Sequence, residues 1–356
     1  MVVSAEGGLP LPWLGAPLAH ALAWPGHALL LHASPGCGAL ALALTVAQAW
    51  LCEGAHSGQP ERPCGRCGSC RLVQSRLHPD LFVLLPQTLR REHGWLLVDD
   101  KPDGEDSKRK PSRQIRIDEV RALIDWSTMT SARGRGKVAV LHPAEALNLQ
   151  SANALLKTLE EPPVGTRLLL TCTDPALLLP TVVSRCQRQR LVGPPLDEAA
   201  AWLAGQGVAD AAAAQVLLAA CSGQPLDALA LAKSGVDATA WSALPAAVAA
   251  GQAGALAGWP LPRALDTLHK LCHDAMACAA GAGPRYFPAS RVPAQGQPEL
   301  LSAWARELDR VARDDAHPWH EALLIEALVR QGARALAPLS ASTQRASSHL
   351  ATLPAP

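Results

Sequence analysis

The sequence predicts an α/β domain with a mostly parallel sheet, followed by a region built only of helices. In the first half of the chain, short apolar runs alternate with helical patterns, which is typical of the strand–helix units of a parallel sheet. After Pro194-Pro195 no convincing strand pattern occurs, and the apolar spacing stays helical. The chain has 356 residues, of which 49% are hydrophobic, so it can fill two or three domains with separate cores.

Four short apolar runs are the predicted strands, namely His27–Ala33, Leu81–Leu85, Val138–Leu141 and Leu168–Thr171. The residues Ser34–Gly38 predict a turn after the first run, and Ala39–Leu51 predicts the helix that follows it. Apolar residues at positions 152, 155, 156 and 159 predict a further helix that packs on the sheet and ends at Pro162-Pro163.

A polar segment from Gln87 to Arg113 interrupts this alternation, and we expect it to be a flexible insertion in a loop. It contains the basic triplet Lys108–Lys110. The triplet could contact DNA, but acidic residues flank it, so a solvated loop is the preferred interpretation.

The helical half begins with three predicted helices. Asp197 is expected to cap a helix that runs through Leu203, and Ala211–Cys221 and Leu226–Lys233 predict the next two. A break at Ser234-Gly235 precedes longer amphipathic helices. Their expected buried stripes are Leu268, Leu271, Cys272 and Ala275; Trp304, Leu308 and Val311; and Leu324, Ala327 and Leu328.

Composition and charge exclude several classes of protein. Charged residues make up 18% of the chain, which is unlike a disordered protein of low hydrophobicity, and no apolar stretch reaches the ~20 residues of a membrane span. The N-terminal residues lack the basic start of a secretion signal, so we expect a cytoplasmic location. The formal charge of +1 gives the whole chain no electrostatic attraction to phosphate backbones.

Four of the ten cysteines lie close together in the sequence, at Cys52, Cys64, Cys67 and Cys70. Four thiolates suit a closed, tetrahedral, structural zinc site. Coincidental thiols, a redox dithiol and an iron–sulfur cluster are the alternatives. The bacterial ferredoxin spacing would require a further cysteine at position 74, which is Gln74, so the cluster is disfavoured.

The turn after the first predicted strand has the outline of a phosphate-binding loop but lacks its chemistry. Aligned on Gly38, the first glycine of the G-x4-G-K-[ST] pattern is Ala33, its lysine is Ala39 and its hydroxyl residue is Leu40. The third predicted strand is followed by His142-Pro143, where an active ATPase would place a pair of magnesium-binding acids. An ordinary strand–turn–helix corner explains the loop equally well at this point.

The block Ser151–Pro163 (SANALLKTLEEPP), with Thr173-Asp174-Pro175 and Ser184-Arg185-Cys186 after it, closely resembles the clamp-loader branch of the AAA+ ATPases. Within this family, an inserted four-cysteine module, a degraded phosphate loop and an intact Ser-Arg-Cys resemble the delta-prime branch of bacterial DNA polymerase III. The resemblance spans about residues 20 to 235.

The resemblance implies a domain order. It comprises a degenerate RecA-like AAA+ domain over 1–192 with the zinc module at 52–70, a three-helix lid over 193–235 and a helical collar for oligomerisation over 236–337. Residues 338–356, rich in Ser, Ala and Pro, are expected to be a flexible tail.

The resemblance also implies the site residues. Arg185, flanked by Ser184 and Cys186, would be an arginine finger that contacts the γ-phosphate of ATP bound to a neighbouring subunit. The lid arginine of active members is replaced by Leu226. The family pattern therefore implies a subunit that binds no ATP, has no ATPase activity of its own and serves the neighbour's site.

The implied partners are ATPase subunits of the gamma or tau type, a clamp-opening delta subunit and, through them, the sliding clamp and primed DNA, in a hetero-pentameric ring. Such a chain would be an accessory subunit of the polymerase holoenzyme, without membrane contact. Two rival hypotheses stay open. One is an independent ATPase with an atypical phosphate loop, and the other is a zinc-dependent DNA-binding protein that uses Cys52–Cys70 and Lys108–Lys110.

Overall fold

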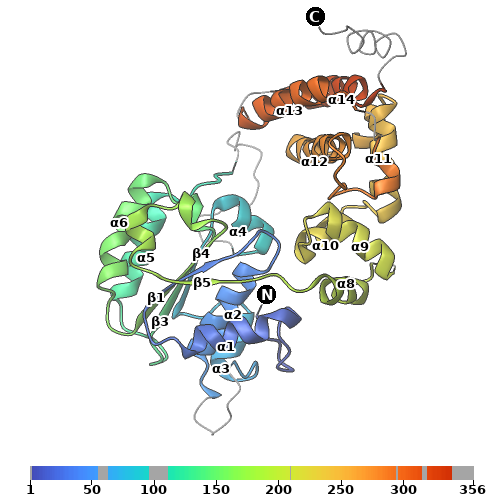
Figure 1. Cartoon of the computed structure of the whole chain (residues 1–356). Coiled ribbons are helices and arrows are strands. Elements are labelled where there is room, and N and C mark those ends of the chain that lie inside the picture. The colour runs from blue at the N-terminus through green and yellow to red at the C-terminus, as the bar shows by residue number, and fades with distance from the viewer. Residues whose placement is uncertain are drawn as a thin grey trace, which may run out of the picture. The chain divides into compact units, whose positions relative to one another are not determined.

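The computed structural model describes residues 2–54, 63–95, 111–208, 210–293, 296–314 and 319–338. The chain divides into two compact units, Met1–Pro194 and Pro195–Pro356. Figure 1 shows the sheet in the first unit, and the described residues of the second unit form helices and no strands. The predicted boundary at residue 235 within the second unit stays a prediction, and the predicted tail lies almost wholly outside the described residues.

The first unit contains a five-stranded sheet in the order β2-β3-β4-β1-β5, and every strand pair is parallel. The predicted parallel α/β fold is thereby confirmed. The strands are β1 (Ala28–His32), β2 (Leu81–Leu84), β3 (Lys137–Leu141), β4 (Thr166–Cys172) and β5 (Gln187–Arg190).

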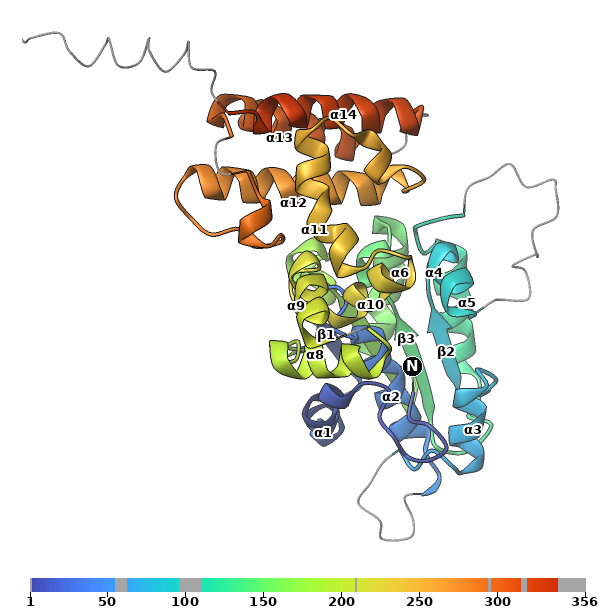
Figure 2. The ribbon, with the colours of Figure 1, turned by 90° about the vertical axis from the view of Figure 1, so that its right-hand side faces the viewer.

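Helices cover both faces of this sheet (Figures 1 and 2). On one face, α5 (Ile117–Thr128) and α6 (Leu149–Glu160) enclose a core with alternate strand residues such as Leu30, Leu141 and Leu168. On the other face lies α2, over Ala39–Leu51 as predicted. The other α-helices among the described residues of this unit are α1 (Gly15–Ala23), α3 (Gly68–Gln74), α4 (Gln87–His93) and α7 (Pro180–Val183).

Two elements of the first unit differ from the sequence prediction. The strand β5 was missed because its sequence is polar, with Gln189 buried and both arginines exposed, as suits an edge strand that pairs only with β1. The start of the predicted flexible insertion is helix α4. Its Arg90 forms a 2.6 Å ion pair with Glu119 of α5, which anchors the helix. The triplet Lys108–Lys110 lies outside the described residues.

The second unit packs its helices around two adjoining apolar clusters. One cluster lies among the first three helices and the other among the last four, and both Cys221 and Leu231 contact the two clusters. The helices are α8 (Leu196–Gly205), α9 (Ala211–Ala220), α10 (Pro225–Lys233), α11 (Ala238–Ala249), α12 (Leu261–Ala279), α13 (Pro298–Arg313) and α14 (Glu321–Leu336).

Two details of the helical prediction were wrong. Asp197 is not a cap, because α8 begins one residue earlier and Asp197 lies in its first turn. The buried stripe of α14 is rotated from the predicted one, so Ala327 is exposed while Ile325 and Val329 are buried. Among the described residues, no helix has both the length and the apolar character that crossing a bilayer requires.

Candidate metal centre and arginine site

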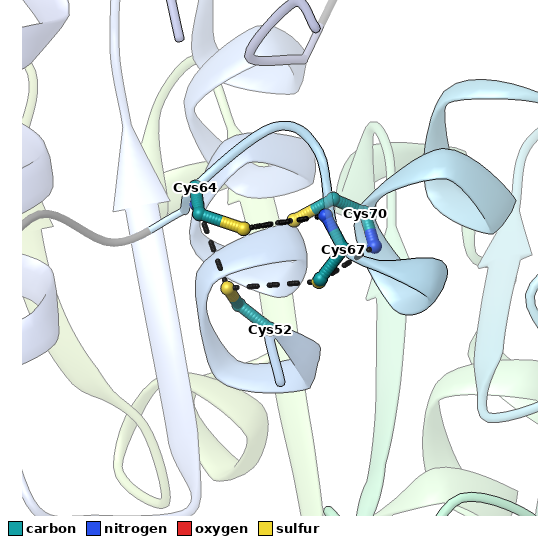
Figure 3. Close-up of side chains that lie close together, drawn as sticks. All are labelled: Cys52, Cys64, Cys67 and Cys70. Carbon is teal, nitrogen blue, oxygen red and sulfur yellow. Dashed lines mark hydrogen bonds between the residues drawn. The ribbon is translucent and has the colours of Figure 1, made fainter. Parts of the chain in front are cut away.

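The four cysteines converge on one point beside the end of α2 (Figure 3). All four sulfur atoms lie within 4.8 Å of one another, and the Cys52–Cys67 and Cys64–Cys70 sulfur pairs are 3.9 and 4.0 Å apart. A tetrahedral ion with Zn–S bonds of about 2.3 Å would space its sulfurs about 3.8 Å apart. The donor set and its spacing therefore fit a tetrahedral thiolate metal site.

Backbone geometry brings these sulfurs together. Cys52 ends α2, and Cys67 is the N-cap of α3, where its sulfur accepts a bond from the backbone N–H of Cys70 at 3.4 Å. Gly65 has a φ of +73°, and a Cβ there would lie 2.0 Å from the carbonyl oxygen of Ser4. Gly65 therefore makes a tight turn between Cys64 and Cys67, whereas Gly68 is the first residue of α3.

The thiol pKa values differ across the cluster. Burial raises the pKa of Cys52 and, more strongly, that of Cys70. Burial also raises the pKa of Cys64, but backbone N–H groups of Arg66 and Cys67 outweigh it and lower the pKa to about 6. The cluster already favours one thiolate near neutral pH, and a bound cation would favour the others.

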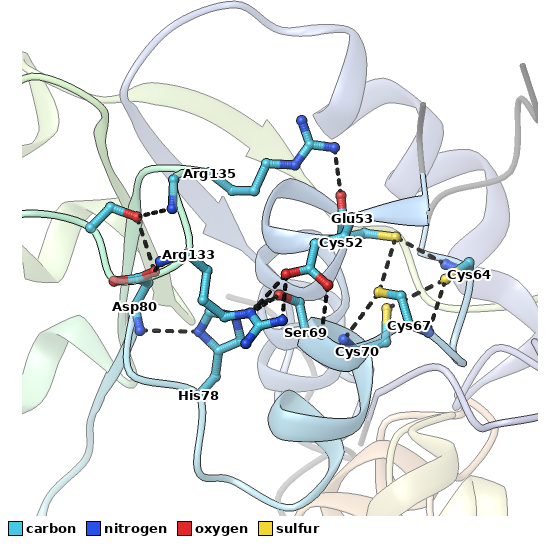
Figure 4. A network of polar contacts seen from close by, with 12 residues as sticks. Cys52, Glu53, Cys64, Cys67, Ser69, Cys70, His78, Asp80, Arg133 and Arg135 are labelled. Carbon is cyan, nitrogen blue, oxygen red and sulfur yellow. Dashed lines mark hydrogen bonds and ion pairs between the residues drawn. The ribbon is translucent and has the colours of Figure 1, made fainter. Parts of the chain in front are cut away.

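A polar network joins the cysteine module to the loop before β3 (Figure 4). The guanidinium of Arg133 contacts Glu53 at 2.6 Å and the Ser69 hydroxyl at 3.0 Å. The same hydroxyl lies 3.1 Å from Nε2 of the buried His78, whose Nδ1 accepts the backbone N–H of Asp80. His78 therefore has its proton on Nε2 and donates it to Ser69. Burial lowers the pKa of His78, which favours this neutral form.

Further bonds of the network fix that loop itself. The carboxylate of Asp80 accepts backbone N–H groups of Ala132 and Arg133, both at 2.8 Å, and the hydroxyl of Ser131 at 2.9 Å. Arg135 donates to the carbonyl oxygen of Cys52 at 2.9 Å. Cys52 and the residues around the metal site are thus tied to β2 and β3 through side chains that the sequence analysis did not single out.

The loop that resembles a phosphate loop lies at the carboxyl edge of the sheet, between β1 and α2. Apolar side chains press against it, because a Cβ on Gly38 would lie 2.4 Å from Leu11 Cδ1. The carbonyl oxygen of Cys37 accepts the indole N–H of Trp13 at 2.9 Å. Leu40 is buried, and the loop has neither a lysine nor a hydroxyl at the positions that would hold phosphate and magnesium.

His142 follows β3 at the same edge, next to Pro143. Its Nδ1 lies 2.6 Å from the hydroxyl of Thr171 on β4. Burial lowers the pKa of His142 to about 4, with a smaller effect of His93. The ring is therefore neutral at physiological pH and bonded within the sheet.

Arg185 lies just after α7, and its side chain is 31% exposed. The Nε and Nη2 atoms of Arg185 are 3.2 and 3.1 Å from Oε2 of Glu160, the last residue of α6, and Nη1 donates to the carbonyl oxygen of Thr181 at 3.0 Å. The hydroxyl of Ser184 donates to that carbonyl as well, at 3.2 Å. Cys186 packs against the core, and burial raises the pKa of its thiol to about 12.

The predicted site residues thus fall into separate groups. The 13 residues of α2 span about 20 Å, so the cysteine cluster at its far end is remote from the phosphate-type loop at its start. Leu226 lies in the first turn of α10, in the second unit. Glu160 was missed as a site residue although it stands inside the block SANALLKTLEEPP, because no spacing rule pairs it with a residue 25 positions away.

Most of the first unit is similar in sequence to a known protein family. Residues 23–194 match the family model described as DNA polymerase III, delta subunit. A DNA polymerase III subunit delta' of Pseudomonas aeruginosa is 38% identical over 212 residues, which are 59% of this chain and 57% of that protein. The subunit delta' of Escherichia coli is 33% identical over 205 residues, 58% of this chain and 54% of that protein.

A tau subunit of Escherichia coli is 31% identical over 160 residues, 45% of this chain and 20% of that protein. The chain thus spans little more than half the length of the delta-prime relatives it matches. The matched segment contains the cysteine cluster, the altered phosphate-type loop and Arg185. Over residues 23–194, just under half of its length, the chain matches this DNA polymerase III family model, and it is similar to delta-prime subunits.

Proposed function

We propose that this chain is a non-hydrolysing, delta-prime-like subunit of the DNA polymerase III clamp loader. Its activity would be exerted in trans, with Arg185 as an arginine finger at the γ-phosphate of ATP bound to an adjacent ATPase subunit. A guanidinium suits this role because it is permanently charged and can bridge phosphate oxygens as charge develops in the transition state.

The observation that supports this proposal most is the contrast between two places in the first unit. The guanidinium of Arg185 is partly open to solvent at the end of α7. The loop after β1 has Ala39 and Leu40 where a nucleotide would need a lysine and a hydroxyl, and Leu11 packs on it. A subunit that contributes to a neighbour's site and holds no ATP itself requires this combination.

The remaining parts of the proposal follow from the family. The first unit would be the AAA+ domain, α8–α10 the lid and α11–α14 the collar, through which the chain joins a hetero-pentameric ring. There the chain would act as a rigid stator that presses on the clamp-opening delta subunit, while gamma or tau subunits hydrolyse ATP. The ring would then place the sliding clamp on primed DNA.

The cysteine cluster would hold one structural zinc ion through Cys52, Cys64, Cys67 and Cys70. Four protein ligands leave no open position for substrate, so the ion would stabilise the module without taking part in a reaction. The hydrogen bonds of Arg133 and Asp80 would connect the module that the ion stabilises to the starts of β2 and β3.

The test mixes this chain with the ATPase and clamp-opening subunits of the same organism's loader and measures assembly mass and ATP turnover. Arg185→Ala should leave the mass unchanged and lower turnover stimulated by clamp and primed DNA by at least about tenfold. Arg188→Ala, which removes an exposed arginine of β5, is the matched control and should have little effect. Unchanged turnover with Arg185→Ala, or ATP hydrolysis by this chain alone, would contradict the proposal.

A further inference from the structure

The contacts of Arg185 use only some of the N–H donors of its guanidinium. An arginine has five N–H donors. Within the described residues, Arg185 donates through Nε and Nη2 to one carboxylate oxygen of Glu160 and through Nη1 to the carbonyl oxygen of Thr181. One N–H on each terminal nitrogen therefore remains for another acceptor.

Both partners of Arg185 are themselves held in place. Glu160 ends α6, whose Leu155 and Leu159 are buried in the core under the sheet. The carbonyl oxygen of Thr181 belongs to α7 and also accepts the Ser184 hydroxyl. The guanidinium is thus held by hydrogen bonds to residues of two helices. The Arg185 side chain is still 31% exposed, so these contacts leave part of it open to solvent.

From this geometry we infer that Glu160 is a positioning residue for Arg185. Its carboxylate holds the Nε edge of the guanidinium, and the remaining N–H groups of the terminal nitrogens point away from it, available to a phosphate oxygen of a nucleotide on another subunit. A donor that is oriented in advance needs no reorganisation when charge develops on the phosphate. This inference rests on the finger role of Arg185 proposed above.

An exposed ion pair contributes little to stability, so the effect of Glu160 should appear in turnover and hardly in folding. In the assembled loader, Glu160→Gln should lower the neighbour's kcat about two- to fivefold, because a weak orienting contact is lost, and should leave KM for ATP and the melting temperature unchanged. Glu161→Gln is the control. It removes the same charge one residue further along, and the described structure records no bond between Glu161 and Arg185.

A double-mutant cycle separates this role from a general structural one. If Glu160 acts through Arg185, Glu160→Gln should cause no further loss of turnover in the Arg185→Ala background. An equal loss in both backgrounds, no loss in the wild-type background, or a gain of turnover would each overturn the inference. If Arg185→Ala leaves turnover unchanged, both the proposed function and this inference are wrong. If Arg185→Ala lowers turnover but Glu160→Gln does not, only the inference is wrong.

Discussion

At the scale of single residues, His142 is an imidazole held at the carboxyl end of β3. Its ring is partly buried and bonded to the hydroxyl of Thr171, so the neutral form is favoured. A carboxylate at position 142 would also be costly to bury unless a cation lay beside it. His142 therefore contributes a side-chain contact between the ends of β3 and β4.

The depressed pKa of His142 predicts a pH dependence of stability. The ring titrates near 6.5 when unfolded and at about 4 when folded, so the folded state resists protonation between these values. This contribution to the unfolding free energy is fully present above about pH 6.5 and is lost as the pH falls. Near pH 4 the unfolding free energy should be lower by about 3 kcal/mol. Urea titrations at several pH values should show a shallower acid loss for His142→Gln than for the wild type.

Gly65 and Gly134 allow strain and steric clash to be separated. Both have a positive φ, but a Cβ on Gly134 meets nothing within 4 Å, whereas one on Gly65 would lie 2.0 Å from the carbonyl oxygen of Ser4. Gly134→Ala should cost about 1–2 kcal/mol for the backbone conformation alone. Gly65→Ala should cost about 1–3 kcal/mol more, because backbone must move. Equal losses in urea unfolding would contradict this account.

At the scale of elements, a strand or helix could be predicted from the sequence when its own residues carry the pattern that stabilises it, and not when its stabilising contacts come from distant residues. The four apolar strands were predictable because strands of a parallel sheet that are buried on both faces are continuous apolar runs. The edge strand β5 has water on much of its surface and lacks this signal. The helix α4 was missed because its anchor, Glu119, lies 29 residues from Arg90.

The Arg90–Glu119 pair therefore tests how α4 is held. The two side chains are only 6% and 17% exposed, so breaking the pair removes a charged partner from a largely buried guanidinium. Glu119→Gln should lower the unfolding free energy by about 1–3 kcal/mol and speed hydrogen exchange in α4. Asp118→Asn breaks an exposed pair with Arg121 at 3.4 Å in the same helix turn and should cost less than about 0.5 kcal/mol. Similar losses for both variants would show that burial of the pair is irrelevant.

The candidate sites were predictable to different degrees for the same physical reason. Cys64, Cys67 and Cys70 are close in sequence, so their spacing alone indicated a metal centre. The groups that orient the sites come from distant segments. Arg133 is 80 residues from Glu53, and Arg185 is 25 residues from Glu160, and only the folded chain brings them together.

At the scale of the whole molecule, the two units have separate cores, so the effect of metal removal should be local. The chain should contain about one zinc ion per molecule, and a strong chelator should speed hydrogen exchange in α3 and in the loop before β3. Exchange in α12–α14 should not change. The double variant Cys67→Ser/Cys70→Ser should reproduce the chelated pattern without chelator. Protection lost equally in both units, or no zinc in the purified chain, would contradict this prediction.

The strand order also has a consequence for how the chain is made. Among the strands of the described residues, β1 pairs only with β4 and β5, so after it is synthesised it has no neighbour until residues 166–190 have followed it. Its sequence, ALLLH, is almost entirely apolar. A nascent chain that stalls before residue 166 would expose this strand with both edges unpaired, which is a template for aggregation. We therefore expect β1 to stay unpaired during biosynthesis until residues 166–190 have been made.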